Sequence, residues 1–529
     1  MPKKKTLAKA NEPLTLEDGQ GLVRRKANRY PEWIAFLFTL LLLTFFPLSM
    51  GGGKYTTLTE FKYICFQSLT IAFGVTILLC LCLFLLDRKL RDVRLKEGRQ
   101  KLSLPQIFLL AYLATAILSA LFSPYEGVWK GLGRFEGLYT IFLYCALFFL
   151  VSFFSEYSKY YIYGFSAVMI PFCVLAILQY AGMDALGLYP EGRNFINSQF
   201  LTTIGNVDMV SGMLSLAIPV AWGGYILLQN KWKYPVFLIS YGLMLYLLKI
   251  IDVDSGRVGV GVTAIVLLPF LAVDSTRIKR ILELGVVSCL VLIFARSFPL
   301  KSIAVAEEAP VFSPDGISKL LLAAAGLLMA IWLVYTFAGN KIRISSKIYR
   351  IALSTLMVVC LVAGVIWLYG YQGENRLLGE ASQFLHGELA DNAGSGRGYV
   401  WKKAVAFIKE RPLLGSGPDT FIERFEPFND EYNQLYGSNV YFDYAHNDFL
   451  QVGVNLGLVG LAAYVGFLVS LAVRAFRRAN KNPLILLFGG SMLCYLAHSF
   501  FSFSIPIITP VFWVMAGLLE KCIRQTPED

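Results

Sequence analysis

The chain has 529 residues, of which 56% are hydrophobic and 16% are charged, and its mean hydropathy is +0.57. Soluble domains use roughly 45–50% apolar and about 25% charged residues, so this composition excludes a soluble globular protein. The net charge of +12 does not indicate nucleic-acid binding, because the lysines and arginines lie in short segments between apolar stretches and form no basic stripe.

The apolar stretches predict an all-α, polytopic membrane protein with about 12–14 transmembrane helices. The alternating pattern of a membrane β-barrel is missing, and several stretches approach or exceed the roughly 18–20 residues that a helix needs to cross a bilayer. The first stretch follows about thirty polar residues and precedes no cleavage site, so we expect an anchor and not a signal peptide. Spans are expected near residues 33–50, 63–86, 104–122, 138–154, 161–181, 209–228, 235–250, 258–273, 281–296, 318–337, 349–371, 447–473, 483–500 and 507–520.

Basic residues mark every second loop between these spans, and the positive-inside rule assigns such loops to the cytoplasm. Both chain termini are then cytoplasmic, and the long loop before the last three spans faces outward. The expected organisation is a basic, disordered cytoplasmic tail (1–30), transmembrane helices 1 to 11 (31–371), a large extracytoplasmic loop (372–446), transmembrane helices 12 to 14 (447–520) and a cytoplasmic tail (521–529).

The large loop is the only extramembrane segment long enough to hold its own structure. One helical face in it carries Val400, Trp401, Ala404, Val405 and Ile408, before a proline that stops the helix. We expect this amphipathic helix to lie on the outer membrane surface or over a cavity. A second helix is expected from residue 420 to about residue 436.

Two arginines are candidates for function, because ionisable residues at the ends of apolar spans are costly to keep. Arg257, in KIIDVDSGRVGVGV, is either a functional group or an arginine that snorkels to lipid phosphates. Arg397, in NAGSGRGYVW, follows glycines that let an anion approach the backbone before a helix begins, and its guanidinium offers phosphate a bidentate fork. The same Gly-Ser-Gly is also typical of a flexible hinge.

His446 is one of three histidines and lies in YAHNDFLQVGVNLGLVG, where an apolar span begins. Asn447, Gln451 and Asn455 recur every four residues, so they form a polar stripe that should face protein or a wet cavity and not lipid. Two plain alternatives stay open. His446 can be an ordinary interfacial histidine, and Asn447 or Asp448 can be the N-cap of the helix.

Other motifs favour structural interpretations. Gly453 and Gly457 form GxxxG, which is typical of close helix packing. The DVD motif at 252–254 has the spacing by which many glycosyltransferases hold a divalent cation, but so short a motif is common by chance, and we expect neither a metal nor a cofactor. His386, in the polar loop, and His498, near the outer end of a span, are less suggestive.

Four stretches taken together resemble one family. They are GNVDMVSGMLSLAIPV (205–220), DSGRVGVGVTAIVLL (254–268), SGRGYVWKKAVAFIKERPLLGSGPDTF (395–421) and AHNDFLQVGVNLGLVGLAAYVGF (445–467). They resemble the O-antigen ligase and polymerase family of bacterial integral-membrane glycan transferases. The last two stretches are the most specific, whereas the family's Ser-Arg-Gly span start reads Ser-Gly-Arg in the second.

The resemblance implies that a glycan passes from an undecaprenyl-diphosphate donor to an acceptor hydroxyl at the outer face of the bacterial cytoplasmic membrane, with inversion and without a metal. The acceptor is a glycan, a lipid, a protein or a wall polymer. Position by position, the resemblance assigns Arg257 and Arg397 to the diphosphate and His446 to the acceptor. Weaker candidates for contacts with sugar or phosphate are Arg193, Asn206, Trp401 and Asn447.

Elementary chemistry agrees with these roles. Breaking a sugar–diphosphate bond develops negative charge on the leaving phosphate, which preorganised guanidinium groups stabilise. A histidine with a pKa of about 6.5 can accept the proton of the attacking hydroxyl at neutral pH. Alternatively, it only orients the acceptor. A polymerase would use the same donor chemistry as a ligase, so the sequence does not separate the two. A polysaccharide or lipid transporter is the alternative from another class, since many spans also suit that role.

Overall fold

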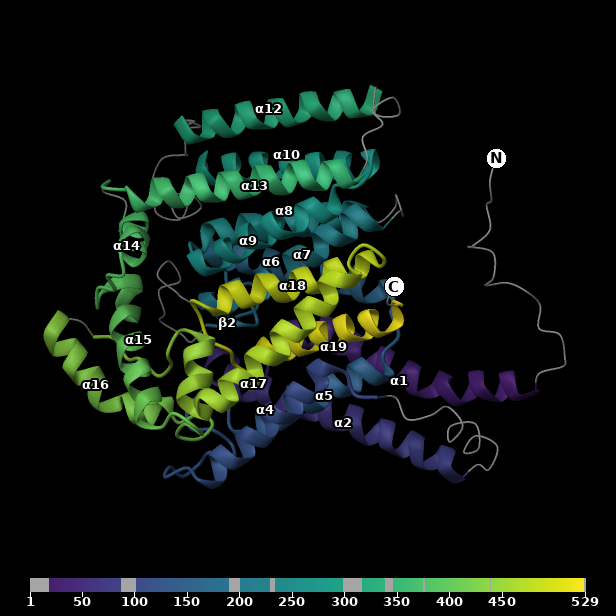
Figure 1. Ribbon diagram of the computed structural model, residues 1–529, viewed down its shortest axis with the longest axis vertical. Coiled ribbons are helices and arrows are strands. Elements are labelled where there is room, and N and C mark those ends of the chain that lie inside the picture. Colours follow the sequence, from purple (N-terminus) through teal and green to yellow (C-terminus); the bar gives the residue numbers. More distant parts are fainter. Residues whose placement is uncertain are drawn as a thin grey trace.

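The computed structural model describes residues 19–86, 101–189, 200–228, 234–297, 316–337, 346–373, 376–437 and 439–527. Long helices lie side by side in one bundle, and α14 and α15 run across one end of it (Figure 1). The long helices are α1 (Gly19–Leu48), α2 (Leu58–Leu86), α4 (Leu104–Leu121), α5 (Leu138–Phe154), α6 (Lys159–Tyr180), α7 (Val207–Leu227), α8 (Tyr234–Ile250), α9 (Asp254–Leu271), α10 (Ser275–Ser297), α12 (Gly316–Phe337), α13 (Ser346–Tyr369), α17 (Asp448–Arg478), α18 (Pro483–Ser499) and α19 (Thr509–Gln525).

Shorter elements connect these helices. They are the 3₁₀ helix η1 (Lys54–Thr56), the antiparallel strands β1 (Phe200–Leu201) and β2 (Gly205–Asn206), and the helices α14 (Arg376–Leu385), α15 (Ala393–Glu410) and α16 (Phe421–Tyr436). In the two-stranded sheet, Phe200 pairs with Asn206 and Leu201 with Gly205. Within the described ranges this hairpin is the only strand pair, so the molecule is built almost entirely from helices.

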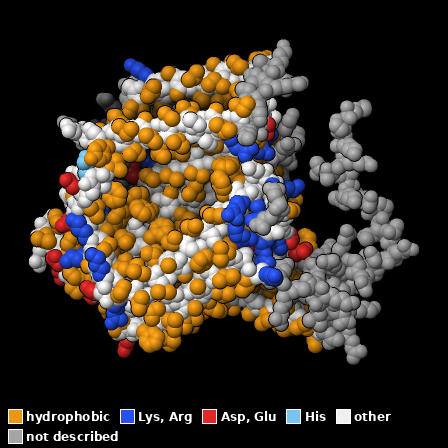
Figure 2. All heavy atoms as spheres, viewed as in Figure 1, with side chains coloured by type: hydrophobic (Ala, Val, Ile, Leu, Met, Phe, Trp, Pro, Cys, Tyr) orange, Lys and Arg blue, Asp and Glu red, His pale blue; other side chains and the backbone are white. Residues whose placement is uncertain are grey.

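Each of the fourteen predicted spans coincides with one long helix. Nine helices in the described part of the chain are long and apolar enough to cross a membrane, and α5, α8 and α18 are apolar but shorter. The predicted all-α, polytopic membrane fold is therefore confirmed. The hydrophobic side chains spread over the long helices, and lysine and arginine gather at the end of the bundle where the C-terminus lies (Figure 2).

Local sequence explains where several helices begin. At the start of α4, the Ser103 amide donates to Gln106 Oε1 at 2.9 Å, which is one half of a capping box. The side chains of Asn206, Asn447 and Asn482 accept hydrogen bonds from amides in the first turns of α7, α17 and α18.

Helix α7 lies at the centre of the bundle. In its most apolar stretch of eighteen residues 89% are buried, against 6% in α12 and none in α13. It packs against α18, α8 and α9, while α12 packs mainly on α10 and α13 touches α9. The two exposed helices thus lie at the edge of the bundle (Figure 1), where an apolar surface is expected to face lipid.

Helices α15 and α16 and the start of α17 share a second hydrophobic core, separate from that of the bundle. Both helices predicted in the large loop are present, and α15 borders a cavity. One detail of its predicted apolar face is wrong. Val405 is exposed, and the buried face runs instead through Val400, Ala404 and Phe407, which are spaced four and three residues apart.

The glycines of the GxxxG motif do not pair two spanning helices. A Cβ on Gly453 would lie 2.7 Å from the side chain of Ile408 in α15. Gly457 has φ +68°, so α17 is kinked there, and a Cβ would lie 2.3 Å from the carbonyl oxygen of Leu413. The predicted close packing exists, but its partner is the C-terminal end of α15 and the loop that follows it.

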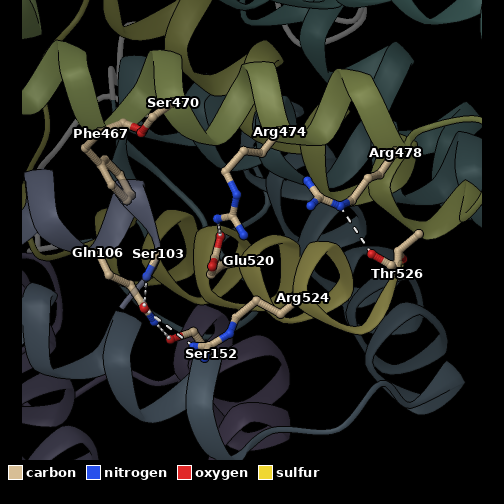
Figure 3. Close-up of polar contacts among 10 residues, drawn as sticks. All are labelled: Ser103, Gln106, Ser152, Phe467, Ser470, Arg474, Arg478, Glu520, Arg524 and Thr526. Atoms are coloured by element: carbon tan, nitrogen blue, oxygen red, sulfur yellow. Dashed lines mark hydrogen bonds and ion pairs between the residues drawn. The ribbon is translucent and has the colours of Figure 1, made fainter. Parts of the chain in front are cut away.

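The opposite end of the bundle holds a cluster of paired polar groups (Figure 3). Arg474 Nη1 lies 2.5 Å from Oε2 of Glu520, whose side chain is fully buried. Arg478 Nε donates to the Thr526 carbonyl at 3.2 Å, and Arg524 Nη1 donates to Gln106 Oε1 at 3.5 Å. We call these three helix-end contacts among α4, α17 and α19 the paired-arginine cluster.

Candidate functional site

Arg397 is presented by an unusual turn at the start of α15. Gly394, Ser395 and Gly396 have φ values of 59°, 60° and 93°, which reverse the chain before the regular helix begins. A Cβ on Gly396 would lie 2.6 Å from the ring of Phe442, so only glycine fits there. The turn is therefore a built structure and not merely a flexible hinge.

The Arg397 guanidinium has few partners in the protein. Its Nη1 donates to the Gly394 carbonyl at 3.1 Å, and its Nε is buried without a hydrogen-bond partner among the described residues. No described carboxylate lies within ion-pair distance of Arg397. A half-buried guanidinium without a carboxylate partner is available for an anionic ligand.

His446 lies in the segment between α16 and α17, with φ +49° in the left-handed region. Its ring meets Phe503 edge to face at a centroid distance of 5.0 Å, and its Nδ1 is buried without a hydrogen-bond partner in the described chain. Burial, followed by the positive charges of Arg397 and Arg134, lowers the pKa of His446 to about 3. The imidazole is therefore neutral at physiological pH.

Arg134 belongs to this site and was not expected from the sequence. Its Nε and Nη2 both lie 2.7 Å from Oδ2 of Asp443, and its guanidinium lies over the Phe503 ring at 4.6 Å. Because His446 packs on the same ring, Arg134 and His446 are neighbours through Phe503. Asp208, in the first turn of α7, interacts electrostatically with both Arg134 and Arg397.

Asp419, from the GSGPDTF stretch, holds the loop that carries Arg134. It is 2% exposed, and its carboxylate accepts hydrogen bonds from the Tyr444 hydroxyl at 2.8 Å and from the Glu136 amide at 3.3 Å. The amides of Arg134 and Gly133 also donate to it, and burial is the largest cause that raises the pKa of Asp419. This carboxyl group thus joins three segments that are far apart in the sequence.

Arg397 lines a cavity of 780 Å³ beside α15. Its walls come from α7, α9, the end of α13, α14, α15 and the segment after α18. The polar lining residues are Asp208, Asp252, Asp254, Ser255, Glu380, Ser395 and Arg397, and the larger apolar ones are Val258, Leu368, Phe384, Leu385, Leu389, Trp401, Phe500 and Phe501. One cavity therefore offers both a polar region and an apolar wall.

Arg257 lies next to this cavity but is already paired. Its guanidinium lies 2.5 Å from Asp252 and 2.8 Å from Asp254, and Nη2 also donates to the Lys249 carbonyl at 3.0 Å. The two carboxylates of the DVD motif thus serve as ion-pair partners for Arg257. An anionic substrate would have to compete with them for this guanidinium, in contrast to Arg397.

The weaker candidates occupy defined positions. Asn206 and Asn447 are helix N-caps, as the plain alternative for Asn447 anticipated. Trp401 lines the cavity, and its indole Nε1 donates to the Ala445 carbonyl at 3.0 Å, directly before the histidine. Arg193 lies outside the described residues.

The polar stripe below His446 faces protein, as predicted. Gln451 and Asn455 are 6% and 8% exposed, and both line a chamber of 60 Å³ with Glu136, Asp448 and Tyr464. Within the described ranges, Gln451 Nε2 and Asn455 Oδ1 have no hydrogen-bond partner. A donor and an acceptor left over in a polar chamber of this size fit ordered water.

The other two histidines, His386 and His498, lie apart from the site that contains Arg134, Arg397 and His446. His386 stacks on Tyr369 at 4.0 Å, and its Nδ1 lies 2.8 Å from the Ser382 carbonyl, which fixes α14 to the end of α13. His498 is fully buried in α18, where a Cβ on Gly212 would lie 3.0 Å from its Nε2.

The fold and the site define a polytopic membrane protein that brings Arg134, Arg397 and His446 together at one end of its helical bundle. The model of the O-antigen ligase family matches residues 317–465, and the comparison with curated proteins found no matching sequence. Residues 317–465 are thus similar to the O-antigen ligase family, and the resemblance seen in the sequence is confirmed for this region. The matched region includes Arg397 and His446, whereas Arg134 and Arg257 lie outside it.

This match supports glycan transfer of the O-antigen ligase and polymerase type, and with it a glycosyltransferase-like enzyme. The apolar helices and the family together support a multi-pass protein of the inner membrane. Lipid-linked glycan and acceptor are the partners that such a family implies.

Proposed function

We propose that this protein transfers a glycan from an undecaprenyl-diphosphate donor to an acceptor hydroxyl, without a metal ion and with inversion at the sugar carbon. The observation that carries the proposal is that Arg397, a half-buried guanidinium without a described carboxylate partner, lies close enough to His446 to influence its imidazole electrostatically. Both residues lie in the region that matches the O-antigen ligase family.

In the proposed reaction the bond between the sugar C1 and the diphosphate oxygen breaks while the acceptor oxygen bonds to C1. Charge grows on the leaving diphosphate, and Arg397 stabilises it because its guanidinium lines the cavity and no described carboxylate neutralises it. The acceptor hydroxyl gives its proton to His446 or is oriented by it. Arg257 assists only where the diphosphate displaces Asp252 or Asp254.

The cavity beside α15 suits the two chemical parts of such a donor. The diphosphate would lie at Arg397, and the carboxylates of Asp208 and Glu380 would accept hydrogen bonds from sugar hydroxyls. The apolar wall from α13 and α14 would contact the first isoprene units. Trp401 lines the same cavity and offers an aromatic face to a sugar.

The proposal includes an orientation in the membrane. Helix α1 begins and α19 ends at the end of the bundle opposite to α14–α16 (Figure 1). Lysine and arginine gather at that opposite end (Figure 2), as the positive-inside rule requires of a cytoplasmic face. Both termini would then be cytoplasmic, and the region 372–446 with the site would face outward.

The test is reconstitution of the protein in vesicles with a fluorescent undecaprenyl-diphosphate glycan and one acceptor at a time: a lipid, a protein, a wall polymer or a second lipid-linked glycan. Consumption of the donor with a new glycosylated product, unaffected by EDTA, supports the proposal. Arg397→Ala and His446→Ala should abolish it, whereas Arg411→Ala, at an exposed arginine beyond the end of α15, should not.

The same assay separates the alternatives. Elongation of a second lipid-linked glycan would identify a polymerase, and transfer to another acceptor a ligase. Movement of intact donor across the bilayer without any product would overturn the proposal and identify a transporter.

A further inference from the structure

The backbone of His446 has a conformation that is uncommon for residues other than glycine. Its φ of +49° lies in the left-handed region, where a side chain other than glycine is strained. Such residues persist when the surrounding contacts over-determine the backbone, and they gather at functional sites. The contacts that fix this turn are therefore informative about the role of the histidine.

The backbone of Ala445, directly before His446, is held by two hydrogen bonds with side chains. Its N–H donates to Gln451 Oε1 at 2.9 Å, and its carbonyl accepts from the Trp401 indole at 3.0 Å. Ala445 itself is fully buried. We call these two hydrogen bonds the Ala445 clamp.

The imidazole has no comparable contact of its own. Its Nδ1 finds no hydrogen-bond partner within the described ranges, and its ring touches Phe503 and Phe442 only edge to face. In many enzymes a carboxylate or carbonyl on one ring nitrogen orients a catalytic histidine. In this chain the orientation of His446 has to come from its backbone, and hence from the clamp.

We propose that Trp401 and Gln451 are positioning residues. Through the backbone of Ala445 they hold the His446 imidazole in the orientation that glycan transfer needs. The inference rests on the proposed function for its catalytic consequence, but the orientation itself can be measured without any substrate. It also gives Gln451 a role, and it gives Trp401 one that does not depend on stacking against a sugar.

Two substitutions remove one hydrogen bond each. Trp401→Phe keeps an aromatic ring against Phe500 and Phe501 and deletes only the indole donor, while Gln451→Leu deletes the acceptor. A matched control is Trp513→Phe, because the Trp513 indole is buried and makes no hydrogen bond to any described residue. It should tolerate the same loss of volume without disturbing the clamp.

The first measurement is the rate at which diethyl pyrocarbonate modifies each histidine, followed by mass spectrometry of the folded protein. Trp401→Phe and Gln451→Leu should change the rate at His446 several-fold, while His386 serves as the internal reference and Trp513→Phe matches the wild type. Unchanged labelling of His446 in both clamp variants, with thermal unfolding at the wild-type temperature, would overturn the inference.

The second measurement is glycan transfer. Each clamp variant should lower kcat by about tenfold to a hundredfold with the donor KM unchanged, since a displacement of about 1 Å costs that much. In a His446→Ala background the clamp substitutions should have no further effect on the residual rate. If His446→Ala leaves transfer intact, the proposed function fails. If it abolishes transfer but the clamp variants keep full kcat and normal labelling, only the clamp inference fails.

Discussion

The two ends of the helical bundle both contain arginines inside the protein, but they use them differently. In the paired-arginine cluster of Figure 3, Arg474 faces the buried carboxylate of Glu520, and Arg478 and Arg524 have carbonyl or amide partners. At the α14–α16 end, Arg397 donates to the Gly394 carbonyl, and no described carboxylate lies within ion-pair distance of it.

The presence of a carboxylate partner at Arg474 and its absence among the described residues at Arg397 indicate a structural role for the first arginine and a functional role for the second. A buried charge with a good partner contributes to the folded state, or at least costs little, whereas a buried charge without one is a cost that folding alone does not explain. The unpaired guanidinium, the left-handed histidine and the left-handed turn at 394–396 all lie at the same end. The cost of keeping them is explained if a ligand supplies the missing partner.

The largest effect is expected at Arg397. Arg397→Ala should lower the transfer rate by roughly 10²–10³-fold, because one preorganised donor to a developing anion has this value. Arg397→Lys should recover little, since a point charge does not reproduce a bidentate grip. The temperature of unfolding should barely change, because no described ion pair is lost. A stable, fully active Arg397→Ala variant would show that Arg397 does not serve the reaction.

The reverse result is expected at the other end. Arg474→Met should destabilise the protein by about 3 kcal/mol, because it leaves the Glu520 carboxylate buried without its partner. Thermal unfolding in detergent measures this loss, and the double variant Arg474→Met with Glu520→Leu should regain most of it. The transfer rate per folded molecule should stay that of the wild type, and a fall would mean that this cluster also serves the reaction.

A smaller loss is expected at the glycine kink that joins α17 to the end of α15. Gly457→Ala should cost about 2 kcal/mol, since φ is +68° and the new Cβ would approach the Leu413 carbonyl to 2.3 Å. Gly326→Ala in α12 is the matched control, because nothing lies within 4 Å of its Cβ position. Equal unfolding temperatures for the two variants would contradict the kink as a structural requirement.

Much of this fold could be predicted from the sequence, because spanning helices are marked by apolar stretches that local composition reveals. Arg397 and His446 could also be singled out, since each lies in a local motif at the edge of an apolar segment. Arg134 could not. Its partner Asp443 is 309 positions away, and the anchor Asp419 comes from a third segment. Such a contact is set by tertiary packing and leaves no local signal.

Arg257 shows the converse limit. Its sequence position suggested a functional or a lipid-bound cation near the membrane surface, and the DVD motif beside it had the spacing of a metal site, although no metal was expected there. Spacing alone does not reveal that Asp252 and Asp254 both turn toward the guanidinium, because Asp252 adopts a left-handed φ of 57° that redirects the chain. Interpreted together, the two motifs form one ion-paired unit.

The smallest expected effect is on the pH dependence of kcat/KM. It depends on the pKa of His446, which burial lowers first and the charges of Arg397 and Arg134 lower further. Burial and the charges of Arg397 and Arg134 lower the pKa of His446 to about 3, so in the free enzyme the imidazole stays neutral well below pH 6.5. Between pH 7 and pH 5, kcat/KM should therefore stay nearly constant. A histidine with the ordinary pKa of about 6.5 would lose activity roughly twenty-five-fold over that range.

The sign of the linked stability follows from the same shift. The folded state binds fewer protons than the unfolded chain below pH 6.5, so the contribution of His446 to stability is present above pH 6.5 and is lost as the pH falls toward 3.

A bound diphosphate should offset the charges of Arg397 and Arg134 and raise the pKa of His446, so the half-point of kcat should lie at a higher pH than that of kcat/KM. Arg134→Gln should raise the half-point of kcat/KM in the same direction. A half-point of kcat/KM near 6.5 in the wild type would show that His446 is solvated and that the two ends of the bundle differ less than the pairing of their arginines indicates.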